Sequence, residues 1–303
     1  MTSITHRRNA VLGAAFLMAT SAIGPGFLTQ TATFTNTLLA SFGFVILLSI
    51  LLDIGAQLNI WRIVVVSGKR AQDISNAVFP GAGYFLAALI VMGGLAFNIG
   101  NVGGAGLGLN SMFGIAPETG AIISGIIAIL IFLRKEAGLL MDRFAQLMGF
   151  IMIALTFYVM FKTEPPVVEA AYRTFIPEQI DPIAIVTLVG GTVGGYITFA
   201  GAHRLLDAGI QGEKAMAEVS RSSVSAILIA STMRIVLFLA VLGIVVKGVP
   251  LNPKNPAETP FEYVAGNWGQ VLFGRRDLGS FYYIRYRCCL YFSFFPNQSL
   301  PNH

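Results

Sequence analysis

The chain has 303 residues, of which 55% are hydrophobic and 12% are charged, and its mean hydropathy is +0.71. Soluble globular domains carry about 25% charged residues, so this composition excludes an ordinary water-facing domain and indicates lipid as the solvent. The formal net charge of +5 does not indicate a nucleic-acid partner, because the basic residues are spread over short loops rather than gathered in one patch.

Seven stretches are apolar over about the 20 residues that a membrane-spanning helix requires. They lie at residues 10–40, 43–65, 80–108, 118–134, 144–162, 182–202 and 222–247. We therefore predict an all-α, polytopic membrane protein with the lipid bilayer as a partner. The first and third stretches are long enough to contain a bend or a break.

Basic loops alternate with loops that are poorer in basic residues. Arg7 and Arg8 precede the first stretch, Lys69 and Arg70 follow the second, and further basic residues lie between stretches four and five and between six and seven. All these loops fall on one side if the stretches alternate in direction. The positive-inside rule then predicts a multi-pass protein of the cell (inner) membrane with a cytoplasmic N-terminus.

The first stretch has Gly24-Pro25-Gly26-Phe27 in its middle. Proline lacks a backbone donor and glycine disfavours the helix, so we expect the helix to break here. In lipid, the freed backbone groups are tolerated only where protein or a polar cavity satisfies them. The alternative is a simple kink packed against neighbouring helices.

The sixth stretch is interrupted in the same way by two glycine pairs. Its central sequence is Gly190-Gly191-Thr192-Val193-Gly194-Gly195-Tyr196. Interrupted segments at matching positions of two halves indicate the midplane binding site of a secondary transporter. Because five stretches precede the one that holds the second break, the halves would have opposite orientations, and we predict an inverted repeat of five-helix units.

These residues resemble the Nramp family of divalent metal transporters, which share the LeuT-like fold. The match is ungapped from Gly13 to Gly68, and the break that begins at Gly24 takes the place of the family's Asp-Pro-Gly-Asn. It resumes through Phe113-Gly114-Ile115 and Gly120-Ala121, and in the sixth stretch it aligns with the family sequence ending in Met-Pro-His-Asn. The resemblance covers residues 10–250. It implies transport of a divalent metal ion by alternating access. The sequence contains no nucleotide loop, zinc spacing or nucleophile elbow, so we predict neither an enzyme nor a cofactor.

The family's functional residues are replaced in this chain. Its metal-binding Asp and Asn fall on Gly24 and Phe27, its Met on Gly194, and two family His residues on Tyr196 and Gly201. Selection of Mn or Fe relies on carboxylate and soft thioether ligands, so no metal ligands are assigned. The remaining hydroxyl, amide and carbonyl groups suit a cation that keeps much of its water, as Mg²⁺ does, or a small organic acid or amine.

In the third stretch, the family's acidic pair falls on Asn98 and Asn101. These asparagines lie on one helical face and either line the transport path or hydrogen-bond a neighbouring helix. The predicted substrate path comprises Gly24, Pro25, Gly26, Phe27, Gln30, Asn98, Asn101, Thr192, Gly194, Gly195 and Tyr196.

The clearest charges inside the apolar stretches are Asp53 in the second and Arg234 in the seventh. An unpaired charge there is unfavourable, and the two stretches occupy matching positions of the two halves. We predict an intramembrane ion pair; the alternative is that each charge lines water separately. Trp61 and Trp268 fit interfacial anchors.

Beyond residue 273 the sequence becomes rich in Phe and Tyr and is interrupted by arginines, so no 20-residue apolar span fits there. The second unit would then stop after about seven transmembrane helices in total, and we expect a truncated or frameshifted reading frame. The predicted regions are a first repeat unit at 1–165, an incomplete second unit at 166–273 and an atypical tail at 274–303. An inactive membrane fragment is therefore an alternative to a transporter.

Overall fold

The computed structural model describes residues 22–132, 138–194, 196–264 and 266, and every regular element in these ranges is helical. The elements are α2 (Pro25–Leu38), η1 (Leu39–Ser41), α3 (Phe42–Ser67), α4 (Ala71–Val78), α5 (Ala82–Phe113), α6 (Pro117–Phe132), α7 (Gly138–Thr163), α8 (Val167–Phe175), α9 (Pro182–Thr192), α10 (Ile197–Asp207), η2 (Glu213–Ala215) and α11 (Met216–Val246). The tail at 274–303 and most of the region before α2 lie outside the described residues. The proposed division into repeat units therefore stays a prediction.

Several of these helices are long and apolar enough to cross a membrane. Within the described residues, the candidate spans are Pro25–Ser67, Ala82–Phe113, Pro182–Asp207 and Glu213–Val246. A further one results if Ile151–Thr163 and Val167–Phe175, which are bent by 105°, count as one broken span, and Pro117–Leu130 is a shorter apolar helix. Large apolar side chains on α5 and α6 point outward and are exposed, as lipid-facing helices require. The predicted all-α membrane class is confirmed.

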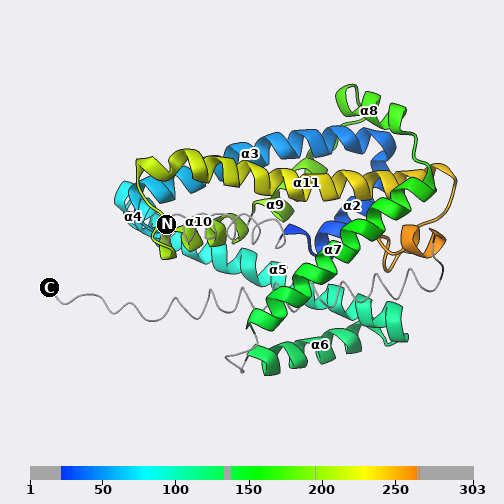
Figure 1. Ribbon diagram of the computed structural model, residues 1–303, viewed down its shortest axis with the longest axis horizontal. Coiled ribbons are helices and arrows are strands. Elements are labelled where there is room, and N and C mark those ends of the chain that lie inside the picture. Colours follow the sequence, from blue (N-terminus) through cyan, green and yellow to red (C-terminus); the bar gives the residue numbers. More distant parts are fainter. Residues whose placement is uncertain (1–21, 133–137, 195, 265, 267–303) are drawn as a thin grey trace, which may run out of the picture.

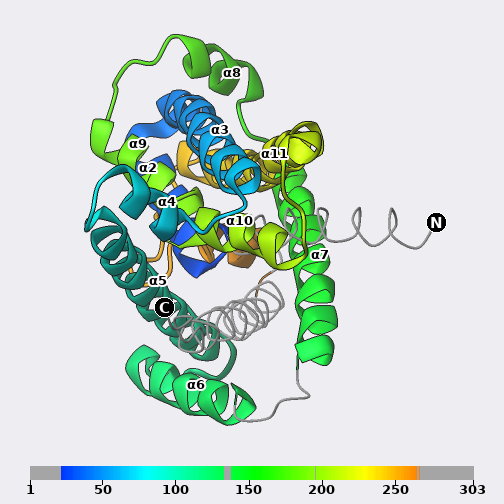
Figure 2. The same cartoon turned by 90° about the vertical axis from the view of Figure 1, so that its left-hand side faces the viewer.

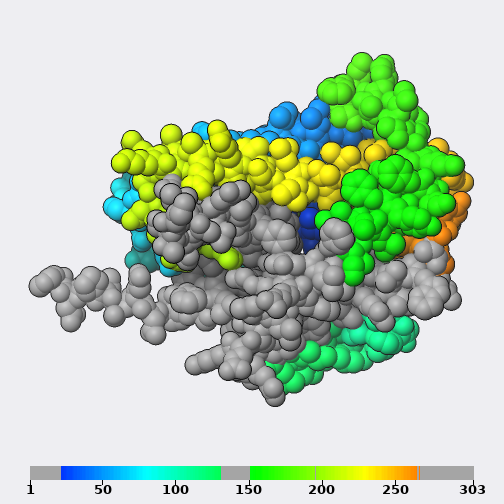
Figure 3. All heavy atoms as spheres, in the orientation of Figure 1, coloured from blue at the N-terminus to red at the C-terminus, as the bar shows by residue number. Residues whose placement is uncertain are grey.

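The short helices α2 and α10 lie among the long ones (Figure 1 and Figure 2). Helices α3 and α11 run side by side along the long axis of the molecule, α7 crosses α11, and α5 and α6 pack together on the opposite side (Figure 1). The view along that axis places α2 and α10 between the α3–α11 pair and α5 (Figure 2). Helix α8 projects from the bundle beside the end of α7 (Figure 3). The segments next to the predicted breaks are thus in the interior.

Both predicted breaks are present. Helical backbone at Ala22 gives way to a bend at Ile23 and Gly24 before α2 begins at Pro25. In the sixth stretch, α9 ends at Thr192 and α10 begins five residues later. Proline at the first position of α2 is compatible with a helix start but not with a helix interior, so the local sequence fixes where this helix begins.

Separate apolar clusters hold the two breaks in place. Phe27 and Leu28 of α2 pack against Met233 and Leu237 of α11. On the other side, Trp61 of α3 packs against Ile197 and its neighbours on α10. Each broken segment is therefore anchored to one helix of the α3–α11 pair.

A buried acid lies in the segment that follows α11. Glu258 is 4% exposed, and its Oε2 accepts a hydrogen bond of 3.1 Å from Asn255 Nδ2. Asn255 also donates to the hydroxyl of Ser111, near the end of α5, at 3.4 Å. Burial raises the pKa of Glu258, which the Ser111 hydroxyl lowers in part and Glu262 raises further.

This raised pKa predicts a pH-dependent stability. Between the ordinary pKa of glutamate and the raised one, the folded state binds the proton of Glu258 and the unfolded state does not, so stability falls as the pH rises through that window. The variant Glu258→Gln should flatten this part of the pH profile, measured as the apparent melting temperature in detergent. The exposed Glu213, which is not among the groups that act on Glu258, serves as the control, since Glu213→Gln should leave the slope as in the parent protein. An unchanged slope in Glu258→Gln would contradict the assignment.

Candidate functional site

The two breaks meet inside the bundle. Helix α2 packs against α9, and a Cβ added at Gly191 would lie 2.8 Å from Oε1 of Gln30. That oxygen is buried and has no hydrogen-bond partner in the described structure. The absence of a side chain at Gly191 thus lets an unsatisfied amide of α2 approach the end of α9.

The first turn of α2 is open on one side and tightly packed on the other. Gly26 is exposed between buried neighbours, and a Cβ added there would meet nothing within 4 Å. On the packed side, a Cβ added at Gly104 of α5 would lie 2.1 Å from Cβ of Pro25. The N-cap residue Gly24 offers no side chain to cap the helix. Pro25 has no amide hydrogen and the Leu28 amide bonds to the Gly24 carbonyl, so the first-turn amides without an intrahelical acceptor are those of Gly26 and Phe27.

The second break is held by α3. Trp61 Nε1 donates to the carbonyl of Thr198 at 3.0 Å, and the Thr198 hydroxyl donates across the break to the carbonyl of Val193 at 2.7 Å. Gln57 lies 3.4 Å from the same hydroxyl through its Oε1 and donates through Nε2 to the carbonyl of Ser223 at 3.1 Å. The Val193 carbonyl at the break is thus satisfied by a polar side chain.

Trp61 is not the interfacial anchor that the sequence predicts. It is 0% exposed, and its indole donates a hydrogen bond beside the second break instead of lying at the membrane surface. Trp268 lies outside the described residues. Sequence reasoning also missed Gln57 and Thr198. An amide in the middle of the apolar second stretch was the available signal for Gln57, since such a group needs a partner in lipid.

Helix α5 presents one face to both breaks. Phe97 stacks edge-on against Tyr196 with ring centroids 5.7 Å apart, and Gly104 meets Pro25. Positions 97, 101 and 104 lie on one face of a helix, so Asn101 belongs to this face. It is 2% exposed, and its Nδ2 has no hydrogen-bond partner in the described structure.

Asn98 differs from Asn101. Its Nδ2 donates to the carbonyl of Gly94 in its own helix at 2.8 Å. The structure gathers Asn101, Gln30 and Tyr196 around the breaks with Thr192. The Nδ2 of Asn98 bonds to its own helix, whereas its buried Oδ1 has no hydrogen-bond partner in the described structure. Gly195 lies outside the described residues.

Asp53 and Arg234 are both buried, at 1% and 3% exposure. They are near enough for their charges to interact, and the Asp53 carboxyl also lies near the Thr192 hydroxyl. In the described part of the chain, however, no nitrogen–oxygen distance of 4.0 Å or less joins the two. The Arg234 guanidinium lies instead over the Phe27 ring, 4.2 Å from its centroid. The predicted direct ion pair is therefore not formed in this conformation, because the aromatic ring of α2 holds the guanidinium.

The residues around the breaks do not form a familiar metal centre. Within the described ranges, no group of three or more His, Cys, Asp or Glu side chains is arranged to hold a metal ion. The charges near the breaks are one carboxylate and one guanidinium, and the other polar groups are amides and hydroxyls.

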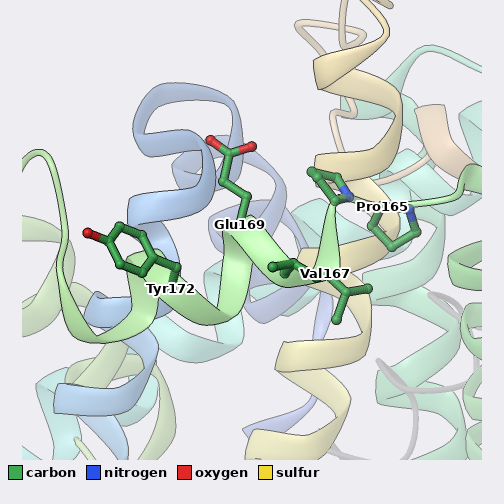
Figure 4. A pocket seen from close by; sticks show the side chains of 6 residues that line it. Pro165, Val167, Glu169 and Tyr172 are labelled. Carbon is green, nitrogen blue, oxygen red and sulfur yellow. The ribbon is translucent and has the colours of Figure 1, made fainter.

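A separate hollow of about 750 Å³ lies at the bend between α7 and α8 (Figure 4). It is lined by Pro165, Pro166, Val167, Val168, Glu169 and Tyr172. The Glu169 carboxylate points away from Val167 in this view. None of the predicted substrate-path residues lines this hollow, so it takes no part in the site at the breaks.

Comparison with known proteins gives a consistent result. The family model for natural resistance-associated macrophage protein-like (Nramp) proteins matches residues 15–274. An uncharacterised membrane protein of Haemophilus influenzae is 94% identical over 274 residues, which are 90% of this chain and 69% of that protein. The uncharacterised membrane protein YcsG of Bacillus subtilis is 68% identical over 264 residues, which are 87% of this chain and 65% of that protein. The chain thus spans about two thirds of the length of these relatives.

Solved structures show the same fold. A mutant of the Eremococcus coleocola manganese transporter superposes with a TM-score of 0.68 at 18% identity, covering 97% of this chain and 67% of that one. A complex of the same transporter with an aromatic bis-isothiourea compound gives a TM-score of 0.62 at 16% identity with the same coverage. The predicted LeuT-like architecture with broken first and sixth helices is confirmed at the level of the fold.

Proposed function

Because this chain belongs to the Nramp family of membrane transporters, we propose that it acts as a secondary transporter, or as the corresponding part of one, by alternating access around the two broken helices. The observation that carries the proposal is the close approach of the helices beside the two breaks, where a Cβ added at Gly191 of α9 would lie 2.8 Å from Oε1 of Gln30 in α2. Unwound helices that meet at one buried polar region are the arrangement in which such transporters bind their cargo.

The cargo has two candidates. Family membership favours a divalent metal ion, and the superposed transporter is a manganese transporter. The residues at the break favour a small organic solute, since Gly24, Phe27 and Gly194 supply no side-chain ligand for a metal. A cytoplasmic N-terminus, predicted from the basic loops, belongs to this proposal as well.

Uptake into proteoliposomes tests the transport proposal. This chain and the Haemophilus influenzae relative should each be reconstituted and assayed with Mg²⁺, Mn²⁺ and a panel of amino and keto acids. We expect saturable uptake of at least one of them. If neither protein takes up any of these solutes above empty vesicles, the transport proposal is wrong.

A matched pair of glycine variants tests whether the contact between the breaks matters. Gly191→Val should reduce uptake at least about tenfold, because its side chain would enter the space of the Gln30 amide. Gly190→Val makes the same chemical change one residue earlier, where an added Cβ meets nothing within 4 Å, and should retain most of the uptake. Equal uptake by the two variants would show that the contact does not serve transport.

A further inference from the structure

The Arg234 side chain is buried, charged and incompletely satisfied. It is 3% exposed, and neither its Nε nor its Nη2 has a hydrogen-bond partner in the described structure. Its guanidinium lies over Phe27, the third residue of α2. Two donors of a fixed charge are therefore left unused at the first turn of a broken helix.

That first turn is itself suited to an anion. Helix α2 has 14 residues, no side-chain cap and no acidic residue in its first turn. Its N-terminus therefore carries unbalanced partial positive charge and amides without intrahelical acceptors. Gly26 leaves open space at the same turn, since a Cβ added there meets no atom of the described residues within 4 Å. Such helix ends bind carboxylates and phosphates.

The balance of charge favours an anion over a cation. Asp53 supplies one negative charge whose influence reaches Arg234, but it is not in direct contact. The two formal charges cancel. At the second break, the negative end of α9 at Thr192 and the positive end of α10 at Ile197 offset each other. The positive end of α2 therefore remains, equivalent to roughly half an elementary charge. A cation would also face the guanidinium at close range. A planar carboxylate, in contrast, matches the fork of guanidinium donors.

We infer that the site at the first break binds the carboxylate group of a small organic acid. This inference rests on the proposed transport function and names its substrate class. Arg234 and the first amides of α2 hold the carboxylate. The unsatisfied Oε1 of Gln30 and Nδ2 of Asn101 offer an acceptor and a donor to the rest of the solute.

The test compares the uptake of two variants, each of which removes one buried charge. In the proteoliposome assay, each amino or keto acid is compared with its carboxamide, which has the same shape without the charge. We expect uptake of at least one acid and none of its amide. Arg234→Gln should lower that uptake at least about tenfold, since hydrogen bonds to charged groups are among the strongest. Asp53→Asn should preserve or increase apparent affinity because it removes a like charge.

Further variants separate a binding role from a structural one. Arg221→Gln removes an exposed arginine from the same helix and should leave uptake unchanged. If Arg234→Gln is not recovered as a monodisperse protein, Arg234→Lys is the variant to test. Lysine keeps the positive charge but lacks the paired donors of the guanidinium. Arg234→Lys should therefore raise the KM for the acid with little change in the amount of folded protein.

The outcomes distinguish this inference from the transport proposal. Uptake of Mg²⁺ or Mn²⁺ that improves in Arg234→Gln and declines in Asp53→Asn would overturn the carboxylate site and leave transport intact. Equal uptake of an acid and its amide would overturn it as well. A complete lack of uptake in every preparation would overturn the transport proposal instead.

Discussion

Gly104→Ala should destabilise the protein and reduce transport, although it adds a single methyl group. That methyl carbon would lie 2.1 Å from Cβ and 2.3 Å from Cγ of Pro25. The proline ring cannot rotate away, and its backbone defines the start of α2. Helix α5 would have to move outward, with a loss of about 1–3 kcal/mol of folding free energy, as is typical of overpacked cores.

The neighbouring glycine supplies the control for this experiment. Gly103 lies in the same helix and is exposed, and a Cβ added there meets nothing within 4 Å. Gly103→Ala should therefore be neutral or slightly stabilising, because alanine favours the helix. The apparent melting temperature in detergent should fall by roughly 2–12 °C for Gly104→Ala relative to Gly103→Ala. Equal melting temperatures for the two variants would show that the packing of Gly104 against Pro25 does not contribute to stability.

The comparison of Gly104 with the breaks shows what the sequence could predict. Gly24-Pro25-Gly26 and the glycine pairs of the sixth stretch disrupt a helix through their own backbone properties, so the positions of both breaks followed from local chemistry. The close approach of Gly104 to Pro25 depends on how α5 packs against α2. A run rich in small residues predicts close packing but does not say which neighbour each glycine faces.

Asp53 and Arg234 also show which features of the site the sequence could not predict. The burial of Asp53 and Arg234 and their nearness were predictable, because charges in apolar spans turn inward. Their lack of direct contact depends on Phe27, which lies far from both in sequence and whose ring faces the guanidinium. Likewise, nothing in the local sequence indicated that Trp61 would donate to Thr198. Contacts between distant segments decided these details of the site.

Restoring the family's methionine at Gly194 should not restore a metal site. A Cβ at this position would lie 2.5 Å from the carbonyl oxygen of Gly190 and 2.7 Å from its Cα. Both are backbone atoms and cannot rotate away. Gly194→Met should therefore force the end of α9 to change its path, lowering stability by about 1–3 kcal/mol and abolishing the native uptake without adding uptake of Mn²⁺.

Gly190→Met is the matched control, because it places the same side chain at the same break, where an added Cβ meets nothing within 4 Å. It should keep a melting temperature near that of the parent protein. A stable Gly194→Met variant that gains saturable Mn²⁺ uptake would contradict this account.

Gly201, where a family histidine falls, is constrained in the same way, since its added Cβ would lie 2.5 Å from the Trp61 ring. At both positions the space that a longer side chain needs is already taken, so a metal ligand there requires a different packing of the break and not the exchange of one side chain.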